Sequence, residues 1–278
     1  MLRPIYLQPG DKVALISPSG VATKEQLDAA CSLLTSWELE PVPGQHVLSR
    51  HGRLAGTDEE RLHDLQTALD AEAIWCMAGD YGMLRIVQEA DYSIFQGNPK
   101  WVIGMNDITV LHSKLHSLGI ESLHAFMPSD YNTTSPEVVT QLRNFLFGII
   151  SSYAIPAHPF NRPGIVETEM IGGMLQWVHN LHDTCIERNT RGTILFIEDP
   201  SNDLYEIDRN VKCMKYTGKF QHLAGLIVGE FGKDSTPEFK EEVYILTQTK
   251  NEITLININI NINQALHENL YSSNEFFK

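Results

Sequence analysis

Histidines at helical spacing are the first residues of this sequence that suggest chemistry. His112 and His116 are four residues apart, and His179 and His182 are three apart, so either pair could place two rings on one metal ion. Neither pair belongs to an HExxH motif or has a third ligand nearby in the sequence. We therefore expect no metal site at these pairs.

Hydroxyl, carboxamide and carboxylate groups gather at turns and at one strand end. Ser17 and Ser19 could serve as nucleophiles, but turn serines usually cap helices, and neither has a visible partner. Asn106 suits a tight turn, and Glu198 lies in a polar stretch that by default is a solvated strand end. The glycines at 79 and 82 do not form a GxGxxG pattern, so we expect no dinucleotide and no other cofactor.

The charge balance excludes one class of partner. The 278 residues include 21 lysines and arginines against 35 aspartates and glutamates, a net charge of −14. A chain this acidic repels phosphate backbones, and it has no local basic patch, so we expect no nucleic-acid partner. Hydrophobic residues make up 42% of the chain, which is enough for a full core.

The cysteines and the first residues bear on the cellular compartment. The four cysteines form no CxxC pair, which favours buried or half-buried thiols in a reducing compartment: Cys31, Cys76, Cys185 and Cys213. Gln8, Asp11 and Lys12 interrupt the apolar core that a signal peptide needs. Because no run of about 18 apolar residues occurs, we expect a cytoplasmic protein without a membrane span.

The elements that must position these residues alternate between strand and helix. Apolar runs predict strands at 13–16, 73–77 and 101–105. Helices are expected after the caps Thr23 and Thr57, and over 107–118. This alternation predicts a parallel sheet covered by helices on both faces. Ligands then collect at the carboxyl ends of the strands, in the turns at 17–20, 78–82 and 104–107.

The second half of the chain predicts a second, smaller α/β domain. The segment 148–164 contains three prolines and little periodicity, as in a linker between domains at 1–147 and 165–278. Beyond the linker, strands are expected at 192–197 and 223–228, and helices at 174–182, 204–216 and 237–247. The alternating Ile/Asn run at 256–263 has a formal strand pattern but is also low in complexity.

Several segments, weak one by one, are specific in their order and spacing over roughly the first 230 residues. They are 10–13 with 17–20, 55–62 with 64–65, 74–76 with 79 and 81–82, Gly104 with 107–109, Gly172-Gly173, and 197–199 with 205 and 207–209. In these segments the sequence resembles the LD-carboxypeptidase family, which includes the microcin-immunity peptidases. The resemblance implies a two-domain α/β fold, often dimeric, and a serine peptidase with a Ser-His-Glu triad. Such enzymes release the terminal D-alanine of murein tetrapeptides during cell-wall recycling.

The resemblance assigns the nucleophile position to Asn106 and the oxyanion-hole N–H groups to Asp80 and Asp107. The family has serine at a sharp strand-to-helix turn, and a carboxamide cannot form an acyl-enzyme by the serine route. Asp80 stands where the family has glycine, so a positive φ there would be strained. Its carboxylate would also oppose negative charge in the transition state.

The resemblance implies that Glu198 is the acid of the triad and that a Gly-His motif near residues 260–263 supplies the histidine. This chain has Ile260, Asn261, Ile262 and Asn263 there. The nearest histidine, His267, lacks the preceding glycine and the flanking pattern. We therefore do not assign the role of the triad histidine to His267.

These departures predict a homodimeric family member that keeps the fold and binds a peptide such as murein tetrapeptide but hydrolyses it weakly or not at all. Two alternatives stay open: an active hydrolase of a peptide or amide with an unconventional site, and a non-catalytic protein that binds another ligand. A third possibility is that the Ile/Asn-rich tail is an altered C-terminus, so that the absent histidine is a property of this sequence alone.

Overall fold

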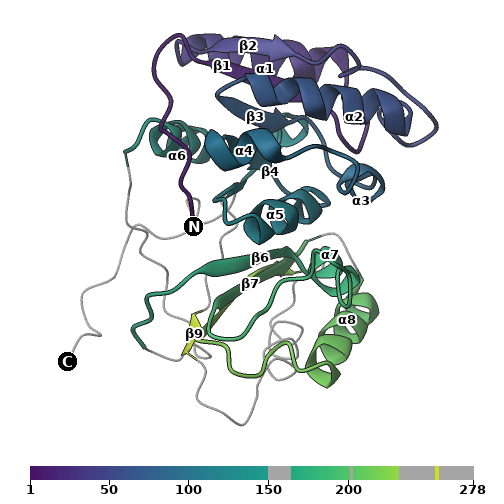
Figure 1. Ribbon diagram of the computed structural model, residues 1–278, viewed down its shortest axis with the longest axis vertical. Helices are drawn as coiled ribbons and strands as arrows, with labels where there is room; N and C mark the ends of the chain where they lie inside the picture. Colours follow the sequence, from purple (N-terminus) through teal and green to yellow (C-terminus); the bar gives the residue numbers. More distant parts are fainter. Residues whose placement is uncertain (150–163, 201–202, 232–253, 257–278) are drawn as a thin grey trace. The chain divides into compact units, whose positions relative to one another are not determined.

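The computed structural model describes residues 1–149, 164–200, 203–231 and 254–256 (Figure 1). The chain divides into two compact units, Met1–Ser151 and Ser152–Lys278, each of which contains one sheet. Most of the segment expected to be a linker, 148–164, lies outside the described residues. None of the helices in the described ranges is long and apolar enough to cross a membrane.

The first unit is built on a five-stranded parallel sheet with the order β2-β1-β3-β4-β5. Its strands are β1 (Lys12–Ile16), β2 (Glu40–Pro43), β3 (Ala73–Cys76), β4 (Trp101–Gly104) and β5 (Leu123–His124). Every residue of β3 and β4 is buried. Successive side chains of a strand point to opposite faces, so both faces of the sheet are covered. The predicted α/β class is confirmed.

Helices follow most of these strands, and the three that start at residues 24, 58 and 108 begin within a residue of where the sequence predicts. They are α1 (Lys24–Ser36), α2 (Asp58–Thr67), α3 (Met83–Ile86), α4 (Ser93–Gly97), α5 (Ile108–Ser117) and α6 (Pro136–Leu146), with short 3-10 helices at Ala68–Asp70 and Pro128–Thr133. Thr23 and Thr57 each form a capping box, with Gln26 and Glu60 as the reciprocal partners. Each box satisfies two backbone N–H groups that the first helical turn would leave unpaired.

Tryptophan rings form much of the apolar interior. Trp37 stacks on Trp75 with ring centroids 6.1 Å apart, and the Trp75 indole N–H donates to the Phe126 carbonyl at 3.0 Å. Trp101 is buried in β4, and Trp177 is buried in the second unit. All four tryptophans thus belong to cores.

The second unit contains a parallel sheet with the order β6-β7-β8-β9. Its elements are β6 (Met170–Met174), α7 (Leu175–Asn180), β7 (Ile194–Asp199), α8 (Leu204–Tyr216), β8 (Gly225–Phe231) and β9 (Thr254–Ile256). Ile207 and Val211 of α8 join Leu195 and Leu226 of the sheet in one core. The helix expected at 237–247 and the tail from 257 onward lie outside the described residues.

The Gly172-Gly173 pair lies within β6, just before α7. Both residues have a positive φ, and a Cβ on Gly172 would overlap the backbone of Phe196 in β7. Only glycine therefore lets these two strands approach as closely as they do.

The expectation of buried or half-buried thiols holds for three cysteines and is wrong for the fourth. Cys76 is buried, and Cys31 and Cys213 are half-buried, whereas Cys185 is exposed. No two of them are joined in a disulfide. Cys185 lies between α7 and β7, in a segment without the regular spacing of apolar residues from which burial can be predicted. Burial raises the pKa of the Cys76 thiol, which leaves it protonated and unreactive at neutral pH.

Candidate functional site

Three turns meet at the carboxyl ends of β1, β3 and β4. A Cβ on Gly20, after β1, would overlap the carbonyl oxygen of Gly79, after β3. A Cβ on Gly79 would lie 2.6 Å from the Cβ of Asn106, after β4. Glycine at 20 and 79 thus lets the turns touch. In an open parallel sheet with this strand order, ligands bind beside the point where the order reverses, here between β1 and β3.

Asn106 occupies the sharp turn between β4 and α5. Its backbone has a left-handed φ of 60°, and its carbonyl oxygen accepts a hydrogen bond from the N–H of Thr109 at 3.1 Å. Asparagine tolerates this conformation better than most residues. The side chain is half-buried against the Gly79 turn. A residue held this way projects from the strand end, as in a nucleophile elbow.

Asp80 has the positive φ that its place in the family pattern implies, with a value of 92°. Its carboxylate is paired with the guanidinium of Arg53, with nitrogen–oxygen distances of 2.9 and 3.1 Å. Both side chains are exposed, so solvent screens the pair and leaves it weak. Arg53 nevertheless places a positive charge beside the carboxylate. Nothing in the sequence pattern indicated this residue.

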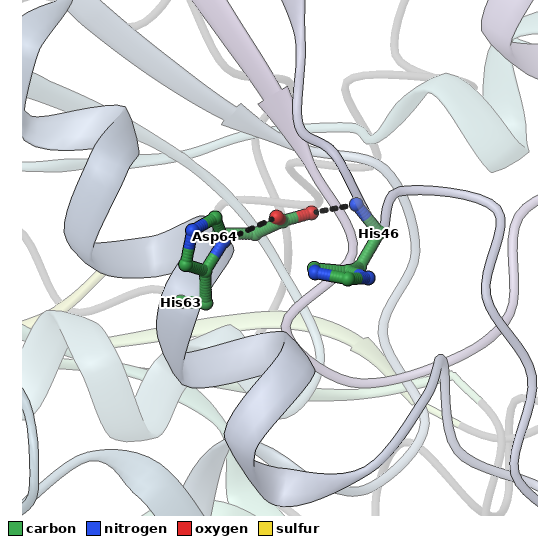
Figure 2. A group of neighbouring side chains, drawn as sticks. All are labelled: His46, His63 and Asp64. Carbon is green, nitrogen blue, oxygen red and sulfur yellow. Dashed lines mark hydrogen bonds and ion pairs between the residues drawn. The ribbon is translucent and has the colours of Figure 1, made fainter.

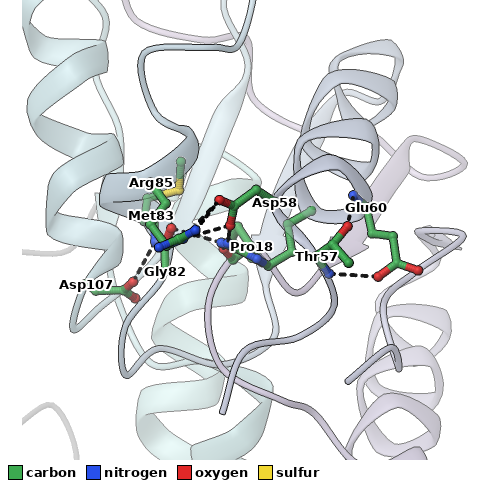
Figure 3. Close-up of polar contacts among 9 residues, drawn as sticks. Pro18, Thr57, Asp58, Glu60, Gly82, Met83, Arg85 and Asp107 are labelled. Atoms are coloured by element: carbon green, nitrogen blue, oxygen red, sulfur yellow. Dashed lines mark hydrogen bonds and ion pairs between the residues drawn. The ribbon is translucent and has the colours of Figure 1, made fainter. Parts of the chain in front are cut away.

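Asp107 is completely buried at the start of α5, and one carboxylate oxygen accepts the Met83 N–H at 3.0 Å (Figure 3). Burial raises the pKa of this carboxyl to about 6. The Met83 N–H and the Ser19 hydroxyl oppose that rise, as does the charge of Arg61, whereas the charge of Asp80 adds to it. The side chain thus fixes the start of α3 against the turn of Asn106.

Arg61 of α2 ties two of the three turns together from inside the fold. Its buried guanidinium donates to the Pro18 carbonyl at 2.6 Å and to the Gly82 carbonyl at 2.9 Å. It also forms an ion pair with Asp58. The Asp58 carboxylate accepts three further hydrogen bonds from the exposed Arg85 (Figure 3). Arg61 lies in one of the segments that resemble the family. The sequence alone gave no reason to assign it this positioning role.

Glu198 lies in the second unit, at the carboxyl end of β7. The residue is 6% exposed and pairs in register with Met174 of β6. Its Cβ would lie 3.0 Å from a Cβ placed on Gly229 of β8, so the glycine makes room for it. The expectation of a solvated strand end is wrong here, because the neighbouring strands cover the side chain. His267 and residues 260–263 lie outside the described residues.

The structure therefore brings Asn106, Asp80 and Asp107 together in the first unit and places Glu198 in the second. The helical histidine pairs have other surroundings. The Nε2 atom of His112 lies 3.0 Å from the Gly104 carbonyl oxygen, in the core. Within the described ranges, His112, His116 and His179 belong to no group of three metal-ligating side chains, whereas His182 lies close to Asp183 and Glu187.

The two sheets, the elbow at Asn106 and the buried glutamate define an α/β protein that presents a side chain at a strand-to-helix turn. The family model described as the LD-carboxypeptidase N-terminal domain matches residues 13–125. The model described as the LD-carboxypeptidase C-terminal domain matches residues 167–264. The chain belongs to the LD-carboxypeptidase family.

Curated relatives and solved structures agree with this assignment. A probable murein peptide carboxypeptidase of Bacillus subtilis (strain 168) is 32% identical over 238 residues, which cover 82% of this chain and 75% of the relative. A murein tetrapeptide carboxypeptidase of Pseudomonas aeruginosa is 28% identical and covers 81% of this chain and 78% of its own. The crystal structure of muramoyltetrapeptide carboxypeptidase from Oxalobacter formigenes shares the fold, with a TM-score of 0.79 at 22% identity over 88% of this chain and 87% of that one.

Proposed function

We propose that this protein binds a peptide of the murein-tetrapeptide type and hydrolyses it weakly or not at all. The observation that carries the proposal is Asn106, which has a left-handed backbone at the elbow where the family pattern has serine. The curated relatives named as murein peptide carboxypeptidases support the ligand class.

The turn geometry supports binding of a carbonyl group near Asn106. In this proposal the backbone N–H groups of Asp80 and Asp107 act as oxyanion-hole donors. Asp107 stands at the N-terminus of α5, where the helix dipole favours negative charge. The carboxylate of Asp80 works against an oxyanion, and its pairing with Arg53 offsets part of that opposition.

The side-chain chemistry supports a loss of hydrolysis. A serine peptidase needs a hydroxyl that attacks the carbonyl carbon and a histidine that takes its proton. The carboxamide of Asn106 has no such hydroxyl. Glu198 takes the role of the acid that would orient the histidine, and the expected Gly-His motif is absent from the sequence near 260–263.

The test is incubation of the full chain with murein tetrapeptide, followed by mass spectrometry of the product. We expect no repeated release of D-alanine, together with a thermal shift on tetrapeptide binding. Asn106→Ser should remain without turnover, because the histidine is missing as well. Repeated turnover by the parent chain that disappears in Glu198→Gln would overturn the proposal. A thermal shift only with a nucleotide or a sugar would favour a different binding function.

The proposal extends to the assembly, location and organisation of the chain. We place the domains at 1–147 and 165–278, with 148–164 as the linker, and expect a cytoplasmic homodimer without a cofactor. The match of separate family models to 13–125 and 167–264 supports this division. Sedimentation analysis checks the dimer, since one chain has a mass of 31.3 kDa.

A further inference from the structure

A cluster of two histidines and two carboxylates lies on the first unit, between α2 and the loop that follows β2. The ligand atoms of His46, His63 and Asp64 all lie within 4.8 Å of one another (Figure 2). His63 and Asp64 belong to α2, and His46 belongs to the loop. Glu60, one helical turn before Asp64, places a carboxylate oxygen 3.6 Å from Nδ1 of His46.

The two carboxylates are each anchored by one oxygen and turn the other toward a histidine. One oxygen of Asp64 accepts the His46 backbone N–H at 2.8 Å, and the other lies 3.4 Å from Nδ1 of His63. In the same way, one oxygen of Glu60 accepts the Thr57 N–H at 2.8 Å, and the other faces His46. Such backbone hydrogen bonds orient metal-binding carboxylates.

The donor set fits a divalent transition metal. Two imidazoles with carboxylate oxygens suit Zn²⁺, whereas Ca²⁺ and Mg²⁺ prefer oxygen ligands throughout. Metal–ligand bonds of about 2.0–2.2 Å place tetrahedral ligand atoms roughly 3.3 Å apart. The ligand atoms of His46, His63 and Asp64 therefore have to approach one another by at most about 1.5 Å. The Glu60 oxygen, 3.6 Å from Nδ1 of His46, is already close to that spacing. The His63 side chain is half exposed and free to make that adjustment by rotation.

A second group of similar composition is less suited to a cation, because a lysine is paired with one of its carboxylates. His182, Asp183 and Glu187 also lie close together, but the ammonium group of Lys219 is paired with a carboxylate oxygen of Glu187. A positive charge at that position opposes a cation. Among the residues that the structure describes, no lysine or arginine forms an ion pair with the four side chains of the cluster on α2.

We propose that His46, His63, Asp64 and Glu60 form a binding site for a single divalent transition-metal ion, with Zn²⁺ the best fit. The ion ties the loop between β2 and α2 to the helix. The same loop carries Arg53, which pairs with Asp80 beside Asn106, and Val47, whose carbonyl accepts the Ser17 hydroxyl. Metal binding therefore stabilises the loop that supports the first and second turns.

The test measures Zn²⁺ binding to the chelator-treated full chain, by calorimetry and by thermal unfolding with and without ZnCl₂. We expect one ion per chain with a micromolar or tighter Kd, and a rise in Tm. His46→Ala and His63→Gln should each weaken binding at least tenfold and remove the Tm rise. His51→Ala, an exposed histidine of the same loop, is the matched control and should bind as the parent does.

Three results would overturn the proposal: no stoichiometric binding, unchanged affinity in the His63→Gln variant, or an equal loss in the His51 control. Circular dichroism of each variant separates lost binding from lost fold. His63 is half exposed on the helix surface, so its replacement leaves the fold intact. Glu60→Gln keeps the capping bond and should weaken binding severalfold, whereas unchanged affinity would remove Glu60 from the ligand set.

Discussion

The left-handed backbones of Asn106 and Asp80 show how single residues shape the candidate site. Both adopt positive φ values in turns that touch through Gly79. For residues other than glycine, such conformations cost roughly 1–3 kcal/mol. They persist only where the surrounding structure enforces them. Here the contacts of Gly20 with Gly79 and of Gly79 with Asn106 supply that enforcement.

The buried carboxyl of Asp107 makes a prediction about pH. Its pKa is about 6 in the fold, against an ordinary value of 3.8, so between these pH values the folded state holds one more proton than the unfolded state. The contribution of this group to stability therefore falls as the pH rises through that window. The unfolding free energy of Asp107→Asn minus that of the parent should therefore rise by roughly 3 kcal/mol from pH 3.5 to pH 7.

Urea denaturation of both chains across this pH range measures that difference directly. Asparagine keeps an oxygen that can accept the Met83 N–H, so the comparison isolates the charge. A difference between the two chains that does not change with pH would show that Asp107 titrates normally. Asp130→Asn is the useful comparison, since burial also raises the pKa of this carboxyl, which is only partly buried.

At the scale of elements, α2 acts as the support of the candidate site. Arg61 of this helix donates to the carbonyls of Pro18 and Gly82. Asp58, one turn earlier on the same face, pairs with both Arg61 and Arg85. The helix itself is fixed at its start by the Thr57 capping box. A single helix thus sets the distance between the first and second turns.

The two arginines that contact Asp58 predict contrasting effects of substitution. Arg61→Met leaves two carbonyls without their donor inside the protein and should destabilise the fold by about 2–4 kcal/mol. Arg85→Met removes an exposed, solvent-screened partner of the same carboxylate and should destabilise the fold far less. Chemical denaturation of the two variants provides the comparison, and equal losses would contradict the assigned role of Arg61.

Elements with a local signal were predictable from the sequence. The capping residues Thr23 and Thr57, the apolar runs of β3 and β4, and the period of α8 each specify their structure within a few residues. The family pattern supplied the positions Asn106 and Glu198, whereas composition or periodicity alone would have left both as ordinary turn or strand-end residues. Contacts such as those of Arg53 with Asp80 and of His46 with Glu60 join residues that no regular spacing in the sequence connects. Such contacts therefore become known only from the structure.

At the scale of the whole molecule, the net charge of −14 makes a prediction about salt. Like charges spread over the surface repel one another and destabilise the compact state, and dissolved ions screen that repulsion. Raising NaCl from about 0.01 M to about 0.15 M should therefore raise Tm by a few degrees at pH 7.5. The same change near the isoelectric pH of about 5.2 should have a much smaller effect, and a fall in Tm at pH 7.5 would contradict the prediction.

The distribution of the buried tryptophans allows the two units to be followed separately by tryptophan fluorescence. Trp37, Trp75 and Trp101 lie in the interior of the first unit, and Trp177 lies in that of the second. An indole shielded from water fluoresces at shorter wavelength than one in contact with it. A chain that keeps tryptophan only at 177 would therefore emit a signal from the second unit alone, and one with phenylalanine at 177 would report on the first.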